Sequence, residues 1–438
     1  MINTKALREK ILDLAMSGKL TNGLVIEKPN IKKLGEVCEI ARGGSPRPIK
    51  SFLTEISTGV NWIKIGDTQV GDKYITSTQE KIIPEGLSKT RQVFKGDFLL
   101  SNSMSFGRPY ILKIDGAIHD GWLVISNFKE TFEENFLYHL LSSSFVKKQF
   151  INLATGSTVK NLNKERVASV EVPIFSLDEQ ERIVAKIEEL FSFIDVIEQE
   201  SADYDALAKQ LDSKVLDLAM KGKLVPQDPT DEPTNELLKR IREEKERLIK
   251  EKKIKKERAL PEITEEEKPY DIPDNWEWVR LSDIQDVRDG THDTPSYVAN
   301  GVPLITSKNL INGNLCFKNV KYISFEDADD IDKRSKVDSG DILFAMIGTI
   351  GNPVIVETHG QRISIKNVAL LKQFSKEFSG EFVFQFLQSQ QDFMRKNASG
   401  GLQKFYSLTM IRKMVAPCPP LEEQKRIVSK IKKIRSYL

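Results

Sequence analysis

The sequence LREKILDLAMSGKL at residues 7–20 returns as LDSKVLDLAMKGKL at residues 211–224, with 10 of 14 positions identical. A second repeat relates PIFSLDEQERIVAKIEELFSFI at residues 173–194 to PCPPLEEQKRIVSKIKKIRSYL at residues 417–438, with 10 of 22 positions identical. Internal repeats indicate that a chain contains more than one copy of a structural unit. We therefore interpret the two halves of the chain as diverged copies of one domain.

Each copy is expected to be a compact α+β domain. Short apolar runs of strand length are punctuated by Gly, Pro, Asn and Ser, and apolar residues at helical spacing follow near the end of each copy. The predicted segments are a helix at 1–20, an α+β domain at 31–177, a long helix at 178–224, a charged helical insert and linker at 225–274, a second α+β domain at 275–421 and a helix at 422–438.

The long helix carries apolar residues in a heptad, which indicates a coiled coil that Gly222 should end. The positions expected in its seams, and in docking of partners, are Ile183, Ile187, Leu190, Ile194, Ile197, Tyr204, Leu211, Val215 and Leu218. The two chain ends continue the same heptad phases and together rebuild most of one such helix. We therefore expect them to meet end to end and to pack antiparallel against the long helix, with a pseudo-twofold axis.

The charged insert has no counterpart in the first copy. Within residues 239–258, 16 of 20 residues are charged and 11 of these are basic. This composition favours a solvated helix with Glu and Lys pairs, and the alternative is a strip that contacts a phosphate backbone or a partner subunit.

Composition indicates a folded, water-soluble chain with no global charge signature. The 438 residues contain 65 Lys and Arg against 63 Asp and Glu. Three scattered cysteines argue for a reducing compartment and against a zinc site, and no apolar run approaches a membrane span. We expect a cytoplasmic protein without a bound metal.

Signatures of catalysis are missing from the sequence. It has no GxxxxGK[ST] loop, no GxGxxG after a strand, no HExxH and no GxSxG. We expect a non-catalytic chain without a cofactor of its own, although a carboxylate-rich nuclease centre leaves no such signature.

Basic residues gather in equivalent parts of the two copies. Residues 135–164 and 393–421 contain no acidic residue, and each holds a polar, Gly-containing loop suited to phosphates and base edges. Further candidate loops lie at 42–50, 101–108 and 288–295. The side chains expected to contact DNA are Arg42, Ser45, Arg47, Lys50, Asn102, Ser103, Arg108, Ser157, Lys160, Asn161, Arg288, Thr291, Lys308, Asn309, Gln403, Lys404 and Tyr406.

These features together resemble a known family. Two diverged α+β domains are each followed by Pro-x-x-x-Leu-[Asp/Glu]-Glu-Gln-x-Arg-Ile-Val and a helix, and the long helix ends in LDLAMKGKLVPQD at residues 216–228. This arrangement is similar to the specificity subunit of type I restriction-modification systems, over nearly the whole chain. The shared motifs are scaffold motifs and contain no catalytic residue.

The resemblance implies two target recognition domains, each of which binds one half of an asymmetric, interrupted sequence in double-stranded DNA. It also implies helices that set the spacing and dock two methyltransferase subunits, to which endonuclease and translocase subunits are added. S-adenosylmethionine, ATP and magnesium would belong to those partners. The short C-terminal helix and the single charged insert depart from many relatives. The alternative is a coiled-coil scaffold or adaptor with two protein-binding α+β domains.

Overall fold

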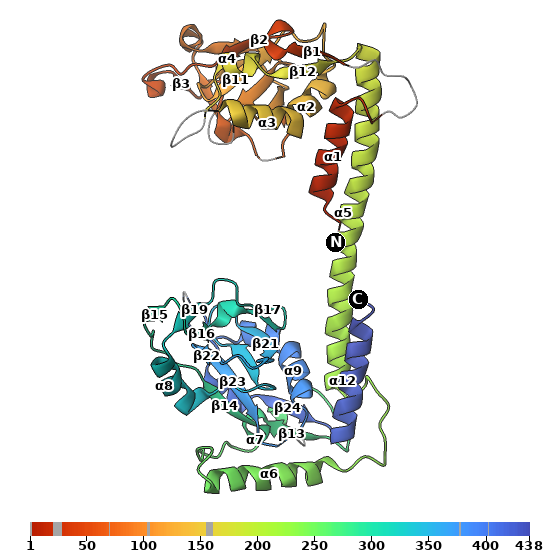
Figure 1. The fold of residues 1–438 in the computed structure, drawn as a ribbon, viewed down its shortest axis with the longest axis vertical. Helices are drawn as coiled ribbons and strands as arrows, with labels where there is room; N and C mark the ends of the chain where they lie inside the picture. The colour runs from red at the N-terminus through yellow and green to blue at the C-terminus, as the bar shows by residue number, and fades with distance from the viewer. Residues whose placement is uncertain are drawn as a thin grey trace. The chain divides into compact units, whose positions relative to one another are not determined.

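The computed structural model describes residues 2–20, 29–69, 71–102, 106–154, 161–375, 378–401 and 403–438. These residues divide into two compact units, Met1–Asp203 and Tyr204–Leu438 (Figure 1). The long helix α5 (Leu177–Met220) begins in the first unit and ends in the second.

The first unit contains an α+β domain built on two five-stranded sheets. Their strand orders are β2-β11-β8-β9-β5 and β3-β6-β4-β10-β7, and a separate β1-β12 pair closes the domain. The strands are β1 (Asn30–Lys33), β2 (Glu39–Arg42), β3 (Leu53–Thr54), β4 (Val60–Ile63), β5 (Tyr74–Ile75), β6 (Glu80–Ile82), β7 (Arg91–Val93), β8 (Phe98–Ser101), β9 (Pro109–Leu112), β10 (Gly116–Ile118), β11 (Trp122–Ser126) and β12 (Glu171–Ile174). The helices are α1 (Thr4–Met16), α2 (Glu134–Ser142), α3 (Ser144–Leu153) and α4 (Lys164–Ala168), with short 3-10 turns at η1 (Leu34–Glu36), η2 (Ile49–Ser51), η3 (Ile65–Asp67) and η4 (Pro84–Lys89).

The second unit repeats this plan with two four-stranded sheets and a further two-stranded pair. Its sheets are β14-β23-β20-β21 and β15-β19-β16-β22, with separate β13-β24 and β17-β18 pairs. The strands are β13 (Glu277–Arg280), β14 (Gln285–Asp289), β15 (Tyr297–Val298), β16 (Val302–Ile305), β17 (Leu310–Ile311), β18 (Asn314–Leu315), β19 (Lys321–Ile323), β20 (Ile342–Ala345), β21 (Gly351–Ile355), β22 (Ser364–Ile365), β23 (Val368–Gln373) and β24 (Val415–Cys418). The helices are α6 (Thr234–Lys250), α7 (Leu281–Ile284), α8 (Phe325–Ser335), α9 (Gly380–Ser389), α10 (Gln391–Lys396), α11 (Leu408–Lys413) and α12 (Leu421–Arg435), with 3-10 turns at η5 (Glu265–Glu267) and η6 (Ser307–Asn309).

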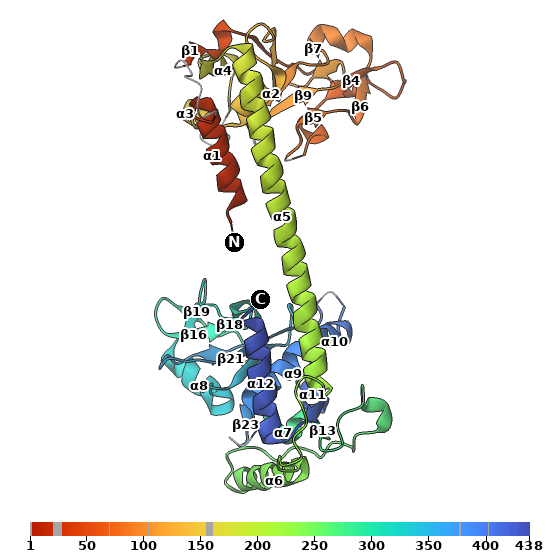
Figure 2. The same ribbon diagram turned by 90° about the vertical axis from the view of Figure 1, so that its right-hand side faces the viewer.

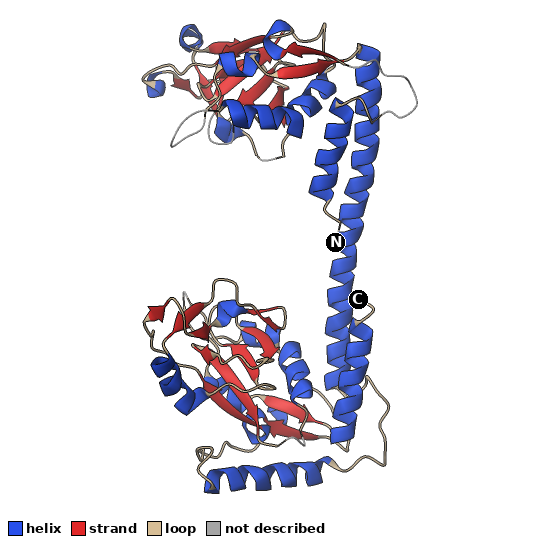
Figure 3. Cartoon of the chain, in the orientation of Figure 1, coloured by secondary structure: helices blue, strands red, loops and turns tan. Residues whose placement is uncertain are grey.

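The two domains share one topology, which confirms the prediction of a repeated α+β fold. The β2-β11-β8-β9 order corresponds to β14-β23-β20-β21, and the parallel pair β4-β10 corresponds to the parallel pair β16-β22. In each unit, helices cover one face of the sheet that contains β2 or β14, as the blue helices beside the red strands in Figure 3 show. Apolar residues of the sheet, these helices and the neighbouring part of α5 form one core in each unit.

The N-terminal helix packs antiparallel on the first part of α5, as both ribbon views show (Figure 2). Arg8 of α1 lies 2.5 Å from Asp195 and 3.1 Å from Glu198 on α5. Its guanidinium also stacks over the ring of Phe191 at 5.0 Å from the centroid. The apolar face of α1 is buried through Ile11, Leu12, Ala15 and Met16.

The C-terminal helix packs antiparallel on the last part of α5, within the second unit. Nε of Arg435 on α12 donates to Oδ1 of Asp212 on α5 at 2.6 Å. The hydroxyl of Tyr204 donates to the carbonyl of Leu438 at 2.9 Å. Each terminal helix therefore pairs with its own part of α5, and the predicted end-to-end meeting of the two terminal helices stays a prediction.

A glutamine shared by the two repeats fixes the start of α5 and α12. Gln180 is fully buried; its Oε1 accepts the backbone N–H of Glu133 at 2.9 Å and its Nε2 donates to the carbonyl of Phe175 at 2.9 Å. Gln424 does the same with Ser379 at 3.0 Å and Pro419 at 2.8 Å. A buried amide that is left unpaired costs free energy. The glutamine therefore ties α5 to the start of α2 in the first unit and α12 to the start of α9 in the second.

The predicted heptad positions are buried or half-buried near both ends of α5 and exposed in parts of its middle. Ile183, Ile187, Ile194 and Val215 are buried, and Leu190, Ile197 and Leu218 are half-buried. Tyr204 and Leu211, predicted for the same seam, are 52% and 44% exposed. The cause lies in the length of the partner helix, because α12 ends at Arg435, whose side chain reaches α5 at Asp212.

The charged insert forms a helix that packs on the second domain. Thr234, Leu237 and Ile241 of α6 are buried, the last two in the domain core, and Arg247 pairs with Glu244, three residues before it, at 2.6 Å. Nζ of Lys245 donates to the carbonyl of Ser282 at 2.7 Å. The solvated face is as predicted, and the apolar face that holds α6 in place is an addition to the prediction.

Candidate nucleic-acid interface

In the first unit, the predicted loop at residues 42–50 leaves β2 and is held against the turn between β10 and β11. The N–H of Gly43 donates to the carbonyl of Trp122 at 3.0 Å, and the N–H of Gly44 donates to the carbonyl of Ile118 at 3.2 Å. A Cβ at Gly43 would lie 2.3 Å from the carbonyl oxygen of His119, so only glycine allows this approach. The backbone of the loop is therefore fixed.

Polar side chains complete this joint at Asp120. Its carboxylate accepts the hydroxyl of Ser45 at 3.1 Å, and its carbonyl accepts Nε of Arg42 at 3.2 Å and Nδ2 of Asn102 at 2.8 Å. Ser45 and Arg42 therefore shape the loop through these bonds, and the guanidinium of Arg42 keeps most of its donors for another acceptor.

The first recognition surface, as we name it, consists of Arg42, Arg47, Lys50, Lys89 and Arg91. All five side chains are exposed, and none lies within ion-pair distance of a carboxylate in the described part of the first unit. Lys89 and Arg91 were missed by the sequence reasoning. They join the loop because a Cβ at Gly44 would lie 2.8 Å from the carbonyl oxygen of Lys89, and no pattern along the chain announces that contact.

In the second unit, the equivalent loop leaves β14 and is held by equivalent backbone bonds. The N–H of Gly290 donates to the carbonyl of Val368 at 3.0 Å, and the N–H of Thr291 donates to the carbonyl of Ile365 at 3.0 Å. A Cβ at Gly290 would lie 2.3 Å from the carbonyl oxygen of Ile365, as at Gly43. The two domains thus present one loop design at one place in the fold.

The side chains of the second loop differ in charge. Asp289 stands where the first copy has Arg42, and its buried carboxylate pairs with Arg334 of α8 and with Nε2 of His292 at 2.8 Å. Nδ1 of His292 lies 2.8 Å from Oδ1 of Asn367. The hydrogen bonds to Asn367 and Asp289 raise the pKa of His292 above its ordinary value.

The other residues predicted for the second loop serve the domain itself. Nε of Arg288 donates to Asp286 at 2.8 Å, and its terminal nitrogens donate to two backbone carbonyls. Thr291 is half-buried, and its hydroxyl accepts the N–H of Asp293 at 3.2 Å. Arg288, which the sequence predicted to contact DNA, is thus engaged inside the fold.

Three other predicted contacts are corrected to structural roles, because their side chains are buried. Asn102 holds Asp120 as described, and its carbonyl accepts the N–H of Leu162 at 2.9 Å. Asn309 accepts the N–H of Thr306 at 3.0 Å and donates to the carbonyl of Cys316 at 2.9 Å. Tyr406 is 4% exposed within the apolar core, where burial raises the pKa of its hydroxyl.

The remaining predicted residues fall into three groups. Lys308 is exposed on η6, and Gln403 and Lys404 are exposed on a loop that the Ser399–Phe405 backbone pair closes. Arg108 and Asn161 are half-buried. Three predicted positions lie outside the described residues: Ser103, Ser157 and Lys160.

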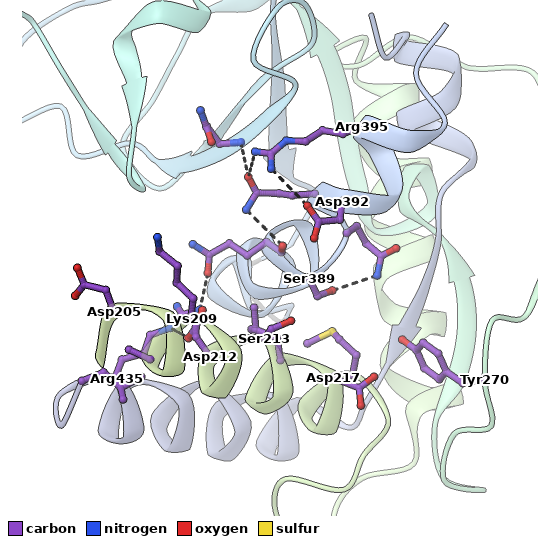
Figure 4. Close-up of a pocket in the computed structure, with 18 residues that line it drawn as sticks. Asp205, Lys209, Asp212, Ser213, Asp217, Tyr270, Ser389, Asp392, Arg395 and Arg435 are labelled. Atoms are coloured by element: carbon purple, nitrogen blue, oxygen red, sulfur yellow. Dashed lines mark hydrogen bonds and ion pairs between the residues drawn. The ribbon is translucent and has the colours of Figure 1, made fainter. Parts of the chain in front are cut away.

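The second unit also contains a polar cleft of about 980 Å³ between α5, α9 and α10 (Figure 4). Its opposite charges pair within the wall: Arg435 with Asp212 at 2.6 Å and Arg395 with Asp392 at 3.5 Å. NH1 of Arg435 also donates to Oε1 of Gln385 at 2.9 Å. These bonds connect α12, α5 and α9, which fits a rigid joint between the spacer and the recognition domain.

Three further observations concern the described residues alone. In the described ranges, no group of three or more His, Cys, Asp or Glu side chains is placed to hold a metal ion. No helix among the described residues is long and apolar enough to cross a membrane. Asp97 and Asp341, carboxylates at equivalent positions, pin turns by accepting the N–H groups of Phe94 at 2.9 Å and Asp338 at 2.7 Å.

Comparison with known proteins finds type I restriction enzyme specificity subunits among the relatives of this chain. The chain is 28% identical over 344 residues to the type I restriction enzyme EcoAI specificity subunit of Escherichia coli, which covers 67% of this chain and 58% of that relative. A solved chain from a study of complex assembly and conformational transition of the type I R-M system has 19% identity and a TM-score of 0.65, covering 95% of this chain and 92% of that one. The HsdS subunit from Thermoanaerobacter tengcongensis has 19% identity and a TM-score of 0.52, covering 93% and 89%.

The repeated domains and their shared loop design define a protein with two recognition modules on helical spacers. Residues 27–203 and 273–437 match the family described as the type I restriction modification DNA specificity domain, which is most of the chain. The chain therefore belongs to this family of specificity subunits.

Proposed function

We propose that this chain is the DNA-recognition subunit of a type I restriction-modification complex, in which each domain binds one half of an asymmetric, interrupted site. One observation carries the proposal. The loops at Gly43 and Gly290 share their backbone bonds and their close approach to a carbonyl, yet Arg42 in one stands where Asp289 is in the other. A fixed frame with different side chains suits two modules that read different base edges.

The spacer supports the bipartite form of the proposed site. Helix α5 has 44 residues, which is a rod of roughly 65 Å at 1.5 Å per residue. The buried Gln180 ties the start of α5 to the first domain, and the buried Gln424 ties the second domain to α12, whose Arg435 contacts α5 at Asp212. Half-site separation in DNA follows from such geometry.

The partners that we propose are two methyltransferase subunits and, through them, endonuclease and translocase subunits. Exposed apolar side chains on α5 offer surface for the methyltransferase: Phe193 and Val196 in the first unit are 57% and 54% exposed, and Leu207 in the second is 64% exposed. Isolated surface leucines are common, but several on one helix favour a docking helix. S-adenosylmethionine, ATP and magnesium would be bound by those partners, and this chain would be non-catalytic.

The test is selection of bound duplexes from a random-sequence library by the complex of this chain with its methyltransferase. The expected result is one interrupted sequence with two defined halves. The variant R42Q/R47Q should relax one half and leave the other unchanged, whereas enrichment of no sequence would refute the proposal.

A further inference from the structure

The last residue of α6 and the segment after it form a basic turn at residues 250–258, which contains six basic and two acidic residues. Five of its cations are exposed and have no carboxylate within ion-pair distance among the described residues. These five are Lys250, Lys252, Lys255, Lys256 and Arg258. Nothing in the recognition function described above uses them.

The turn is anchored to the second domain and therefore has a defined place. Lys252 adopts a φ of +57° at the end of α6, and its N–H donates to the carbonyl of Ile249 at 3.0 Å. Ile254 packs against the domain core, and Glu257 lies 2.9 Å from Nε of Arg412. These contacts engage Ile254 and Glu257, and the five cations remain exposed to solvent.

The second acid of the turn is also neutralised internally, because Glu251 lies 2.7 Å from Lys253. Both carboxylates that could have compensated the five cations are therefore engaged within the chain. The exposed side of the turn carries uncompensated positive charge. A solvated helix alone would be expected to alternate its charges, as α6 does at Glu244 and Arg247.

The turn lies beside the strand that leads into the second recognition loop. The Arg412 that contacts Glu257 also donates to the carbonyl of Val287 on β14 at 2.6 Å, and Arg288 donates to the carbonyl of Lys253 at 3.5 Å. From Val287 to Thr291 the chain covers about 14 Å at ~3.4 Å per residue. That distance corresponds to roughly four base pairs along a duplex at 3.4 Å each.

We propose that the basic turn at residues 250–258 binds phosphates of the DNA duplex that flanks the second half-site, independently of sequence. This proposal rests on the proposed function and adds a contact that only one end of the site receives, because the first copy has no counterpart of the insert. Lysine and arginine side chains on an anchored backbone turn suit phosphate contacts, which set affinity and register without reading bases.

The experiment measures binding of the complex with its methyltransferase to duplexes whose flanks differ. One duplex extends 12 base pairs beyond the second half-site and three beyond the first, and the other reverses these lengths. The unmodified complex is expected to bind the first duplex about tenfold more tightly at low salt. If the turn makes two phosphate contacts, the plot of the logarithm of the binding constant against the logarithm of salt concentration should be steeper for the first duplex by about 2.

The variant K255Q/K256Q should remove this difference, and K239Q/R242Q is the matched control. The control removes the same charge from exposed positions on α6 itself and should keep the difference. Equal binding of the two duplexes by the unmodified complex would overturn the inference, as would loss of the difference in the control. If K255Q/K256Q prevents assembly with the methyltransferase but leaves flank dependence intact in the assembled fraction, the turn is a protein-docking surface and the inference is wrong. Failure of every complex to prefer the site over random duplex would instead refute the proposed function.

Discussion

Replacement of Arg435 by Met should loosen the joint between the spacer and the second recognition domain. The guanidinium makes bonds of 2.6 and 3.1 Å to the carboxylate of Asp212, and it donates to Oε1 of Gln385 and of Gln388 at 2.9 Å each. Methionine keeps the apolar stem of the side chain and removes all four bonds.

The magnitude follows from these contacts. The ion pair is partly exposed, with side-chain exposures of 29% for Arg435 and 34% for Asp212, and a pair of this kind contributes about 0.2–1 kcal/mol. Each hydrogen bond to a glutamine oxygen contributes about 0.5–1.5 kcal/mol, and the buried Gln385 is left without its donor. The expected loss is about 1–4 kcal/mol in the free energy of unfolding of the second unit. At about 2–4 °C per kcal/mol for a domain of this size, the melting temperature should fall by roughly 2–16 °C.

The assay is calorimetry of the full chain, with Lys432→Met as the control. Lys432 lies on the same helix and pairs with Glu381 at 2.5 Å, but both side chains are about half exposed, so its loss should cost under about 0.5 kcal/mol. A double-mutant cycle with Asp212→Asn isolates the ion pair. The reasoning is refuted if Arg435→Met destabilises the chain no more than Lys432→Met does.

Three further perturbations test the loops and the spacer. Gly43→Ala places a Cβ 2.3 Å from a backbone oxygen, so reading of one half-site should weaken while the melting temperature falls by only a few degrees; unchanged selection would contradict the assigned geometry. The pKa of His292 is raised in the folded loop, so its stabilisation is complete below its ordinary pKa and is lost as pH rises through the raised value. The melting temperature should therefore fall as the pH rises above the ordinary pKa of histidine and through the raised value, and His292→Gln should flatten that dependence in a pH series of thermal unfolding. Ile187→Ala, at a fully buried position, should cost about 2–5 kcal/mol in urea unfolding, and Leu211→Ala, at a position that is 44% exposed, should cost under about 1 kcal/mol. Equal costs at the two positions would contradict the observed packing.

The repeats made the fold predictable from the sequence, because each copy constrains the interpretation of the other. The charges of the side chains that join the terminal helices to α5 were not predictable in this way. Arg8 occupies the repeat position of Asp212, and Phe191 occupies that of Arg435. Arg8 lies over the ring of Phe191, whereas Arg435 forms an ion pair with Asp212. Only the folded structure shows that equivalent positions carry the cation on opposite sides of the contact.

The candidate DNA contacts were predicted less well than the fold, because the sequence does not show which polar side chains are buried. Composition and turn residues located the loops at Arg42 and Thr291, but they could not separate an asparagine or tyrosine that faces solvent from one that supports the turn. Asn309 and Tyr406 are of the second kind. Lys89 was missed because its proximity to Gly44 arises from packing between strands that are distant in sequence.

The central claim is that the two domains read two halves of one DNA sequence. The most direct measurement is methylome sequencing of a strain that carries the unmodified gene, of one that lacks it and of one that encodes R42Q/R47Q. The account predicts one interrupted sequence that is methylated only when the chain is present, and relaxation of a single half in the variant. Identical methylation with and without the gene, or relaxation of both halves in the variant, would contradict it.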